Sequence, residues 1–168
     1  MSSVSLRPYL AADAERCAAI FRSSVEELAS EDYSAEQCAA WAALADDSAA
    51  FAKRLAGALT LMALVDGEPA GFASLEGAET IDMLYVGPDF ARRGVATALL
   101  DALVRLAAAR GAKAVTGEVS DTARPLFERQ GFQAQRRYLV QLDDECLANT
   151  SMTKRLAPLA DAIEPVRH

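Results

Sequence analysis

The hydrophobic pattern of the chain changes its period near residue 58. Before this point, apolar side chains such as Phe21, Val25 and Leu28 recur at the three- and four-residue spacing of a helix. Ser34 and Gln37 lie three residues apart, as in a capping box, and this spacing predicts that a second helix begins near Ala35. The expected elements of this half are a strand at 4–7 and helices over 13–30, 35–45 and 49–55.

After residue 58, apolar runs of strand length alternate with turns. Asp66-Gly67-Glu68-Pro69 is typical of a tight turn, and Gly111 lies where a long helix would end. Asp121 or Thr122 is expected to cap the last helix, which ends near Gly131. The pattern predicts strands at 59–65, 70–75, 80–86, 113–119, 132–142 and 146–156, with helices over 95–110 and about 122–130.

This order of elements is α+β. The segments 80–86 and 113–119 are joined by one long helix, so a right-handed crossover should bring the two strands parallel, or nearly so. No repeat, linker or low-complexity segment interrupts the pattern. We therefore expect one domain over residues 1–157, followed by a C-terminal tail at 158–168.

The chain of 168 residues has a formal net charge of −7. This charge argues against nucleic acid or an anionic membrane surface as a partner, and favours cationic or neutral substrates. The longest apolar run, Ala58–Val65, is broken only by Thr60 and is far shorter than the roughly 20 residues that span a bilayer. Because the N-terminus has no signal-peptide pattern, we expect a cytoplasmic protein.

The only histidine is His168, the last residue. Catalysis by Ser-His-Asp or Cys-His within the chain, and zinc binding by histidine, are therefore not expected. The cysteines Cys17, Cys38 and Cys146 have no metal-like spacing, so we expect no metal, and Cys17 and Cys38 should be buried. A general base must then be a carboxylate, a tyrosine, a cysteine or a bound water.

The segment from Ile81 to Gly111 predicts an anion site. The strand stops at Gly87-Pro88, and Arg92-Arg93-Gly94 leads directly into a helix whose first N–H groups have no partner within the helix. A pyrophosphate would suit these donors, the helix dipole and the two arginines. The alternative is a solvated turn with arginines at the surface. The segment lacks the Gly-Lys-Ser/Thr of a P-loop and the spaced glycines of a dinucleotide fingerprint.

Two further features are the segments LYVGPDFARRGVATALL at 84–100 and SDTARPLFERQGF at 120–132. These segments resemble the GNAT superfamily of acyl-CoA-dependent N-acetyltransferases. DYSAEQ at 32–37 with Trp41, and NTSMTK at 149–154, look similar to the bacterial YafP-like acetyltransferases. The resemblance implies a mixed, mostly antiparallel sheet of about six to seven strands, with helices on both faces. It also implies a splay between the strands at 80–86 and 113–119.

The resemblance also implies a cofactor, acetyl-CoA, used as a cosubstrate. The pyrophosphate would bind the N–H groups of the loop and helix start, and the pantetheine would follow the preceding strand, where the N–H of Leu84 would polarise the thioester carbonyl. Ala91 departs from the family pattern in the loop, where contacts are mainly backbone. The implied cofactor-binding residues are Leu84, Tyr85, Val86, Arg92, Arg93, Gly94, Val95, Ala96, Thr97, Ser120, Ala123, Phe127 and Arg129.

A second departure concerns the proton that the leaving thiolate takes up. Many relatives have a tyrosine where this chain has Phe127, and phenylalanine cannot donate a proton. Either another group or solvent protonates the thiolate, or the activity is altered. A thiol pKa of about 8.5 would allow solvent to do so.

Two carboxylates are candidates for the catalytic base that removes the proton of the amine. Asp82 precedes the loop and is expected on the same face as Leu84 and Val86, and Glu118 ends the next core strand. Each could instead be ion-paired or face solvent. Candidate substrate residues are Tyr33, Trp41 and Tyr138, although packing in the core is the alternative for Trp41 and for Tyr85.

The leading hypothesis is an N-acetyltransferase that transfers acetyl directly to a primary amine of a small molecule or protein, as a monomer or homodimer. One alternative is a catalytically inactive CoA-binding or regulatory module of the same fold, which Phe127 would suit. The other is a binding protein for a different phosphorylated ligand.

Overall fold

The computed structural model describes residues 3–157, which form a seven-stranded sheet in the order β1-β2-β3-β4-β5-β7-β6. Every neighbouring pair is antiparallel except β4 and β5. The predicted α+β class is confirmed, as is the parallel pairing across the long helix. The strands are β1 Val4–Pro8, β2 Leu59–Val65, β3 Glu68–Glu76, β4 Thr80–Val86, β5 Ala114–Ser120, β6 Gln133–Leu142 and β7 Glu145–Arg155.

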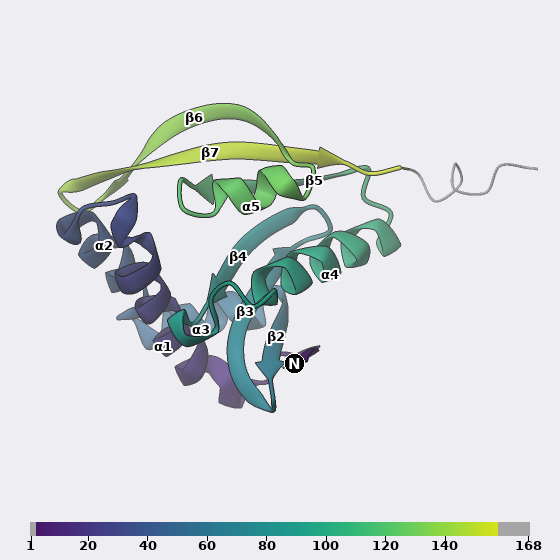
Figure 1. The fold of residues 1–168 in the computed structure, drawn as a ribbon, viewed down its shortest axis with the longest axis horizontal. Helices are drawn as coiled ribbons and strands as arrows, with labels where there is room; N and C mark the ends of the chain where they lie inside the picture. Colours follow the sequence, from purple (N-terminus) through teal and green to yellow (C-terminus); the bar gives the residue numbers. More distant parts are fainter. Residues whose placement is uncertain (1–2, 158–168) are drawn as a thin grey trace, which may run out of the picture.

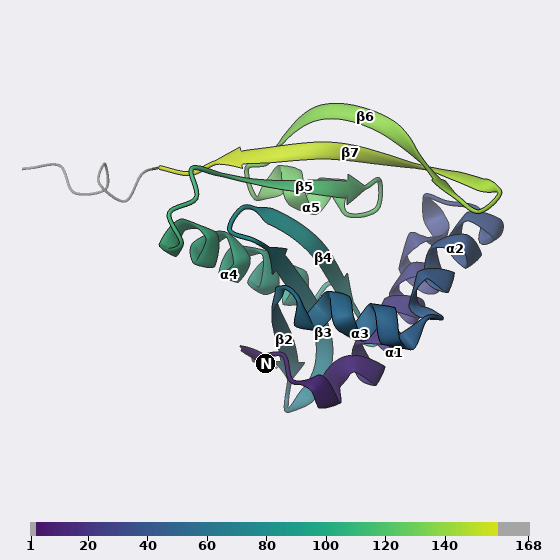
Figure 2. The same cartoon turned by 180° about the vertical axis from the view of Figure 1, so that it is seen from behind.

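Helices cover both faces of this sheet, as predicted. The helices are α1 Ala14–Ser23, α2 Ala35–Ala42, α3 Ser48–Ala56, α4 Val95–Ala109 and α5 Arg124–Arg129. In Figure 1, α4 and α5 lie in front of the strands, and Figure 2 shows α1 and α3 on the opposite side. None of the helices within residues 3–157 combines the length and apolarity needed to cross a membrane. The predicted tail at 158–168, which contains His168, lies outside the described residues.

The alternation of side chains along the strands divides the core into two clusters. On β3, Phe72 packs with α1, α2 and α3, whereas Ala73 and Leu75 pack with α4. Burial of such residues on both faces explains why the central strands read as almost continuous apolar runs. Cys17 and Cys38 are free thiols buried in the first cluster, which confirms their prediction as core residues.

Local sequence signals determine several element ends. Ser34 Oγ accepts from the N–H of Gln37, whose side chain accepts from the N–H of Ser34, so the predicted capping box starts α2. Gly111, with φ of +86°, follows α4 as expected. The prediction that Asp121 or Thr122 caps the last helix is wrong. Ser120 Oγ instead accepts from the N–H of Ala123, at 3.1 Å, just before α5.

The first helix departs from the predicted single element. The α-helical pattern ends at Ser23 and continues as a π-helical turn over Ser24–Leu28, followed by a 3₁₀ turn over Ala29–Glu31. A π turn widens the helix and rotates the residues that follow it. Ser24, Val25 and Leu28 of this turn line a cavity described below.

Gly71 sets how closely α4 approaches the sheet. A Cβ atom at this position would lie 2.8 Å from the carbonyl oxygen of Tyr85, and 3.1 Å and 3.3 Å from side-chain atoms of Val95 and Leu99. Only a residue without a side chain permits this packing. Gly71 of β3 therefore lets the first turns of α4 pack directly on β3, next to β4.

We predict that Gly71→Ala destabilises the fold by about 1–3 kcal/mol, because a methyl group would force α4 away from β3 and β4. Gly117→Ala is the matched control, since its Cβ would meet other atoms at 3.6 Å or more, an ordinary contact. The control should change stability by less than about 1 kcal/mol. Urea unfolding measures both, and equal stability of the two variants would contradict this account of Gly71.

Candidate active site

The site lies where β4 and β5 separate. Their pairing comprises Thr80 with Thr116 and Ile81 with Gly117, and it ends there. Beyond Ile81, β4 stays paired with β3 whereas β5 stays paired with β7, so the two strands diverge (Figure 1). The splay predicted between these strands is confirmed. It leaves one side of β4 open to a ligand at the centre of the sheet.

A cavity of about 280 Å³ enters this gap beside α4. We call it the α4-side cavity. It brings together most of the predicted cofactor-binding residues, which lie on β4, on the loop before α4, on the first turn of α4 and around the start of α5. They are Leu84, Tyr85, Val86, Arg92, Gly94, Val95, Ala96, Thr97, Ser120, Ala123 and Arg129.

Two predicted cofactor-binding residues do not line the α4-side cavity. The guanidinium carbon of Arg93 lies 5.6 Å from the ring centroid of Phe90, a cation–π contact. Phe127 is buried, packs against Phe132 with ring centroids 5.0 Å apart, and lines a second cavity instead. Its place in the apolar core explains why a phenylalanine is stable there.

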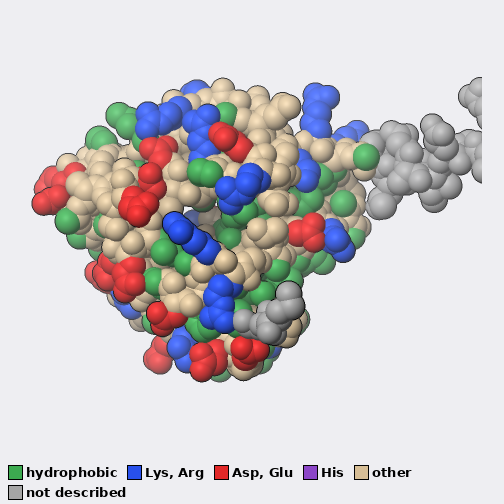
Figure 3. All heavy atoms as spheres, viewed as in Figure 1, with side chains coloured by type: hydrophobic (Ala, Val, Ile, Leu, Met, Phe, Trp, Pro, Cys, Tyr) green, Lys and Arg blue, Asp and Glu red, His purple; other side chains and the backbone are tan. Residues whose placement is uncertain are grey.

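The start of α4 has the geometry of an anion site. Gly94, with φ of +81°, precedes the helix, and the first intrahelical hydrogen bond runs from Ala98 N–H to Gly94 O at 3.0 Å. The N–H groups of Val95, Ala96 and Thr97 come before that bond, and neither a capping side chain nor an acidic residue occupies the first turn. Figure 3 shows Lys and Arg side chains bordering the central hollow of this face. Donors, dipole and positive charge thus coincide.

Arg92 stands in this loop with φ of +61°. A left-handed conformation is uncommon for a residue with a side chain and is found more often at functional sites. The turn places Arg92 on the wall of the α4-side cavity, beside the open end of the helix. Arg92 thus adds a positive charge next to the open N–H groups of α4.

A second cavity, of about 440 Å³, opens on the other side of the gap, and we call it the α3-side cavity. Its walls combine aromatic residues of α1, α2, α3 and β4 with charged residues of β3, β4, β5 and α3. The two cavities share lining residues at the splay, so they meet there. The shared residues are Trp41, Leu84, Tyr85, Ser120 and Ala123.

Asp82 lies in the α3-side cavity but not on the predicted face. The β3–β4 register pairs Ser74 with Met83 and Leu75 with Ile81, so Asp82 is an extra residue on β4, a β-bulge. The bulge breaks the alternation of side chains. Leu84 and Val86 pack toward α4, whereas Asp82 faces α3, so the predicted shared face is wrong.

At this position Asp82 forms a bidentate ion pair with Arg54 of α3. The Nε and Nη2 atoms of Arg54 each lie 2.7 Å from a different carboxylate oxygen. The hydrogen bonds that Arg54 donates to Asp82 are the main cause of the raised pKa of Arg54. Both oxygens of Asp82 are thus engaged with a cation, which makes Asp82 a poor candidate for proton removal.

Glu118 lines the same cavity and is hydrogen-bonded differently. Tyr138 of β6 and Ser151 of β7 donate their hydroxyls to one oxygen, Oε2, the latter at 2.7 Å. Burial and the Glu118 contact raise the pKa of Tyr138 to about 12, so this hydroxyl remains protonated at neutral pH. The structure therefore brings Glu118 and Tyr138 together, with Tyr138 as a partner of the carboxylate rather than a wall of the cavity.

Comparison with known proteins agrees with this geometry. The sequence over residues 29–156 matches the protein family described as the acetyltransferase (GNAT) domain. The chain belongs to the GNAT acetyltransferase family. It is 37% identical over 142 residues to the uncharacterized N-acetyltransferase YafP of Escherichia coli K12, covering 84% of this chain and 89% of YafP. The predicted resemblance to the family and to YafP is confirmed, and membership classes the chain as an acyltransferase.

Solved structures share the GNAT fold. A GCN5-related N-acetyltransferase from Rhodopseudomonas palustris has a TM-score of 0.90 and 54% identity, covering 93% of this chain and 98% of its own. PaiA N-acetyltransferase from Thermoplasma acidophilum, solved in complex with coenzyme A, has a TM-score of 0.75 at 17% identity, with coverage of 92% and 99%. The second likeness concerns the fold alone.

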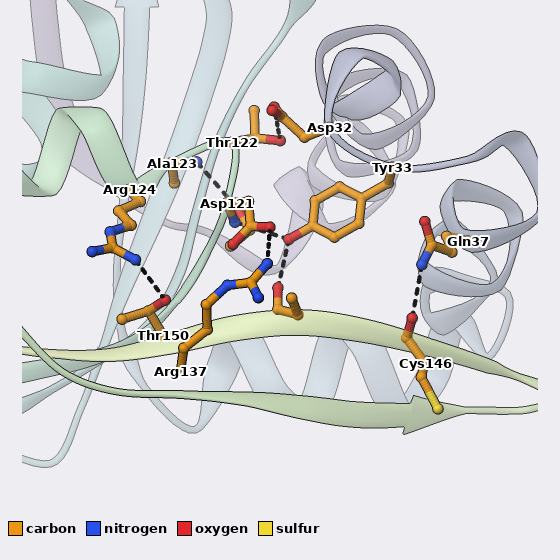
Figure 4. A network of polar contacts seen from close by, with 12 residues as sticks. Asp32, Tyr33, Gln37, Asp121, Thr122, Ala123, Arg124, Arg137, Cys146 and Thr150 are labelled. Atoms are coloured by element: carbon orange, nitrogen blue, oxygen red, sulfur yellow. Dashed lines mark hydrogen bonds and ion pairs between the residues drawn. The ribbon is translucent and has the colours of Figure 1, made fainter.

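Among the predicted substrate residues, Trp41 lines both cavities of this GNAT domain, whereas Tyr33 lines neither. The buried hydroxyl of Tyr33 donates to Ala148 O at 2.6 Å and accepts from Asp121 N–H at 2.8 Å. In Figure 4 its ring reaches from the segment before α2 to the loop after β5 and to β7. Tyr33 therefore ties together three segments that are distant in the sequence.

Neighbouring contacts reinforce this connection. Asp32 accepts from the hydroxyl of Thr122 at 2.8 Å, and Arg137 of β6 donates to Asp121 at 2.9 Å (Figure 4). The linked loop, residues 120–123, supplies lining residues to both cavities. The network thus holds one wall of the site in place.

Sequence reasoning missed several lining residues. Arg54 lies on α3, 28 positions before its partner Asp82, and no motif connects the two. Ser24, Val25, Leu28 and Ala29 line the α4-side cavity from the π turn and the 3₁₀ turn that follow α1. The periodicity of the sequence shows which of these residues share a helix face, but not which cavity that face lines.

We predict that Tyr33→Phe destabilises the protein by about 1–3 kcal/mol, since it leaves the half-buried N–H of Asp121 and the buried carbonyl of Ala148 without their partner. Tyr9→Phe is the control, because its hydroxyl makes no hydrogen bond within residues 3–157 although its ring packs against the same cluster. Chemical denaturation of both variants measures the difference. If Tyr33→Phe is no less stable than the control, the two hydrogen bonds of the Tyr33 hydroxyl do not stabilise the fold as proposed.

Proposed function

We propose that this chain is an acetyl-CoA-dependent N-acetyltransferase that transfers acetyl directly to a primary amine of a small molecule or protein. The observation that carries the proposal is the meeting of two cavities at the gap between β4 and β5. One contains an open helix end suited to a pyrophosphate, and the other contains carboxylates suited to an amine. A ternary complex would place both reactants at the splay.

The residues of the α4-side cavity fit coenzyme A by their chemistry. The N–H groups of Val95, Ala96 and Thr97, with Arg92, would hold the pyrophosphate. The edge of β4 at Leu84–Val86, left unpaired by β5, would bind the amide groups of the pantetheine. Bound acetyl-CoA would supply the thioester that the amine attacks. PaiA of the same fold was solved with coenzyme A, which supports this assignment.

The remaining chemistry is proton transfer. An amine attacks only when it is neutral, so a base must take its proton. Glu118 suits this role better than Asp82, because its two hydrogen bonds fall on Oε2 while both oxygens of Asp82 are held by Arg54. A backbone N–H of β4 at Leu84 would polarise the carbonyl. Solvent would protonate the departing thiolate, whose thiol has a pKa of about 8.5.

An inactive CoA-binding module is the second candidate. It is favoured by one observation, the buried Phe127, which offers no proton donor at a wall of the α3-side cavity. A thiol-release assay with acetyl-CoA and a panel of amines separates the two functions. Release of CoA that depends on an amine supports the enzyme, whereas tight acetyl-CoA binding without release on any amine supports the module.

We predict that Gly94→Glu weakens acetyl-CoA binding at least about tenfold, because it places negative charge beside the pyrophosphate site. Gly67→Glu is the matched control. Gly67 has nearly the same φ, +83° against +81°, has equally open surroundings, and lies in the turn between β2 and β3. Isothermal titration measures both, and unchanged affinity in folded Gly94→Glu would mean that the anion site is elsewhere.

We predict that Glu118→Gln lowers kcat by about 100-fold or more while the dissociation constant for acetyl-CoA stays within about twofold, as expected when a general base is removed. Glu128→Gln, an exposed carboxylate on α5 paired with Arg124, is the control. The pH dependence of kcat/KM supplies a second readout. Wild-type turnover in Glu118→Gln, with an unaltered pH profile, would rule out Glu118 as the base.

A further inference from the structure

The walls of the α3-side cavity carry an aromatic surface. Tyr85 packs edge-on against Phe21 and Trp41, with ring centroids 4.7 Å and 6.2 Å apart. The side chains of Trp41 and Tyr85 are only half-buried, so part of each ring faces the cavity. Leu44 and Val140 continue the apolar lining. Burial of an apolar ligand against these walls would stabilise the complex, because it removes apolar surface from water.

The charged groups of this cavity are mostly acidic. Glu76, Asp82 and Glu118 line it, and Arg54 is its only cationic lining residue within residues 3–157. Arg54 and Asp82 neutralise each other through two contacts of 2.7 Å. Glu76 and Glu118 therefore remain as uncompensated negative charges, in a chain whose formal net charge is −7.

Glu118 is oriented to receive a cation. Tyr138 and Ser151 hold its Oε2 atom from two neighbouring strands, so the position of the carboxylate is defined before any ligand binds. Both of these hydrogen bonds reach the same oxygen, which leaves Oε1 for a further partner. An ammonium group is a donor of the right charge, and aromatic faces nearby favour it further.

From these contacts we propose that the acceptor is a cationic amine with an apolar body and no carboxylate, whose ammonium pairs with Glu118 while its body packs on Trp41 and Tyr85. This inference rests on the proposed function, because it concerns the acceptor side of the same site. The proposal excludes free amino acids as preferred acceptors. The carboxylate of an amino acid would need a cation in the cavity, and the guanidinium of Arg54 is already paired with Asp82.

The reaction balances with these groups. The bound ammonium gives one proton to Glu118, and its nitrogen then forms the new C–N bond as the C–S bond of the thioester breaks. The second proton leaves the nitrogen to solvent, and the thiolate takes up a proton. Glu118 returns its proton to solvent, so one amine cation and one acetyl-CoA give one amide, one CoA thiol and one proton.

Matched acceptors test the proposal. Thiol release from acetyl-CoA is measured with 2-phenylethylamine, with L-phenylalanine, which adds a carboxylate, and with ethylamine, which lacks the ring. We expect kcat/KM for 2-phenylethylamine to exceed that for each of the other two at least about tenfold, because the carboxylate is repelled and the ring fills the apolar wall.

Two variants test which residues cause the selectivity. In Asp82→Asn, Arg54 loses its ion pair and its positive charge can attract the carboxylate of L-phenylalanine. The preference for 2-phenylethylamine over L-phenylalanine should therefore fall at least about fivefold. Glu118→Gln should lower the same ratio. Glu68→Gln, at the start of β3 beside the distant turn that follows β2, is the control and should leave the ratio unchanged. A ratio is insensitive to any loss of turnover that both acceptors share.

The outcomes separate this inference from the proposed function. Preference for 2-phenylethylamine, with the ratio reduced in both variants, supports it. This inference is overturned if L-phenylalanine or ethylamine is used equally well or better. It is also overturned if the ratio is unchanged in Asp82→Asn and Glu118→Gln. Neither result contradicts the proposed N-acetyltransferase activity. Acetyl-CoA binding without thiol release on any amine of a broad panel overturns both.

Discussion

β4 and β5 are paired only at their beginnings, where Ile81 lies opposite Gly117. Each strand retains its other neighbour, so the sheet stays intact while the two strands diverge. Backbone groups of β4 beyond Ile81 can therefore meet a ligand without any loss of strand pairing. The gap also lets a cavity beside α4 meet a cavity beside α3, so that two reactants can approach from opposite faces.

Close packing around the gap gives the site its two different chemistries. Gly71 allows α4 to lie close against β3, and the open N–H groups of the helix border the gap beside β4. On the other face, the bulge at Asp82 directs that carboxylate to Arg54 and leaves Glu118 as the carboxylate with an oxygen to spare. Helix dipole and positive charge thus lie on one side, and acidic and aromatic residues on the other.

Much of this arrangement could be predicted from the sequence, because its signals are local. The change of period near residue 58, the capping box at Ser34 and the loop before α4 each depend on neighbouring residues. The features that were missed depend on distant partners or on irregular backbone. The face of Asp82 follows from a bulge, the role of Tyr33 from contacts with Asp121 and Ala148, and the pairing of Arg54 with Asp82 from elements 28 residues apart.

Titration of ¹⁵N-labelled protein with acetyl-CoA, followed by amide chemical shifts, tests the central claim most directly. Binding in the gap predicts the largest changes at the amides of Leu84–Val86 on β4 and of Arg92–Thr97 before and within α4, with little change in β1 and β2, which lie at the far edge of the sheet. Saturable shifts concentrated outside these two segments, or no shifts at all, would contradict it.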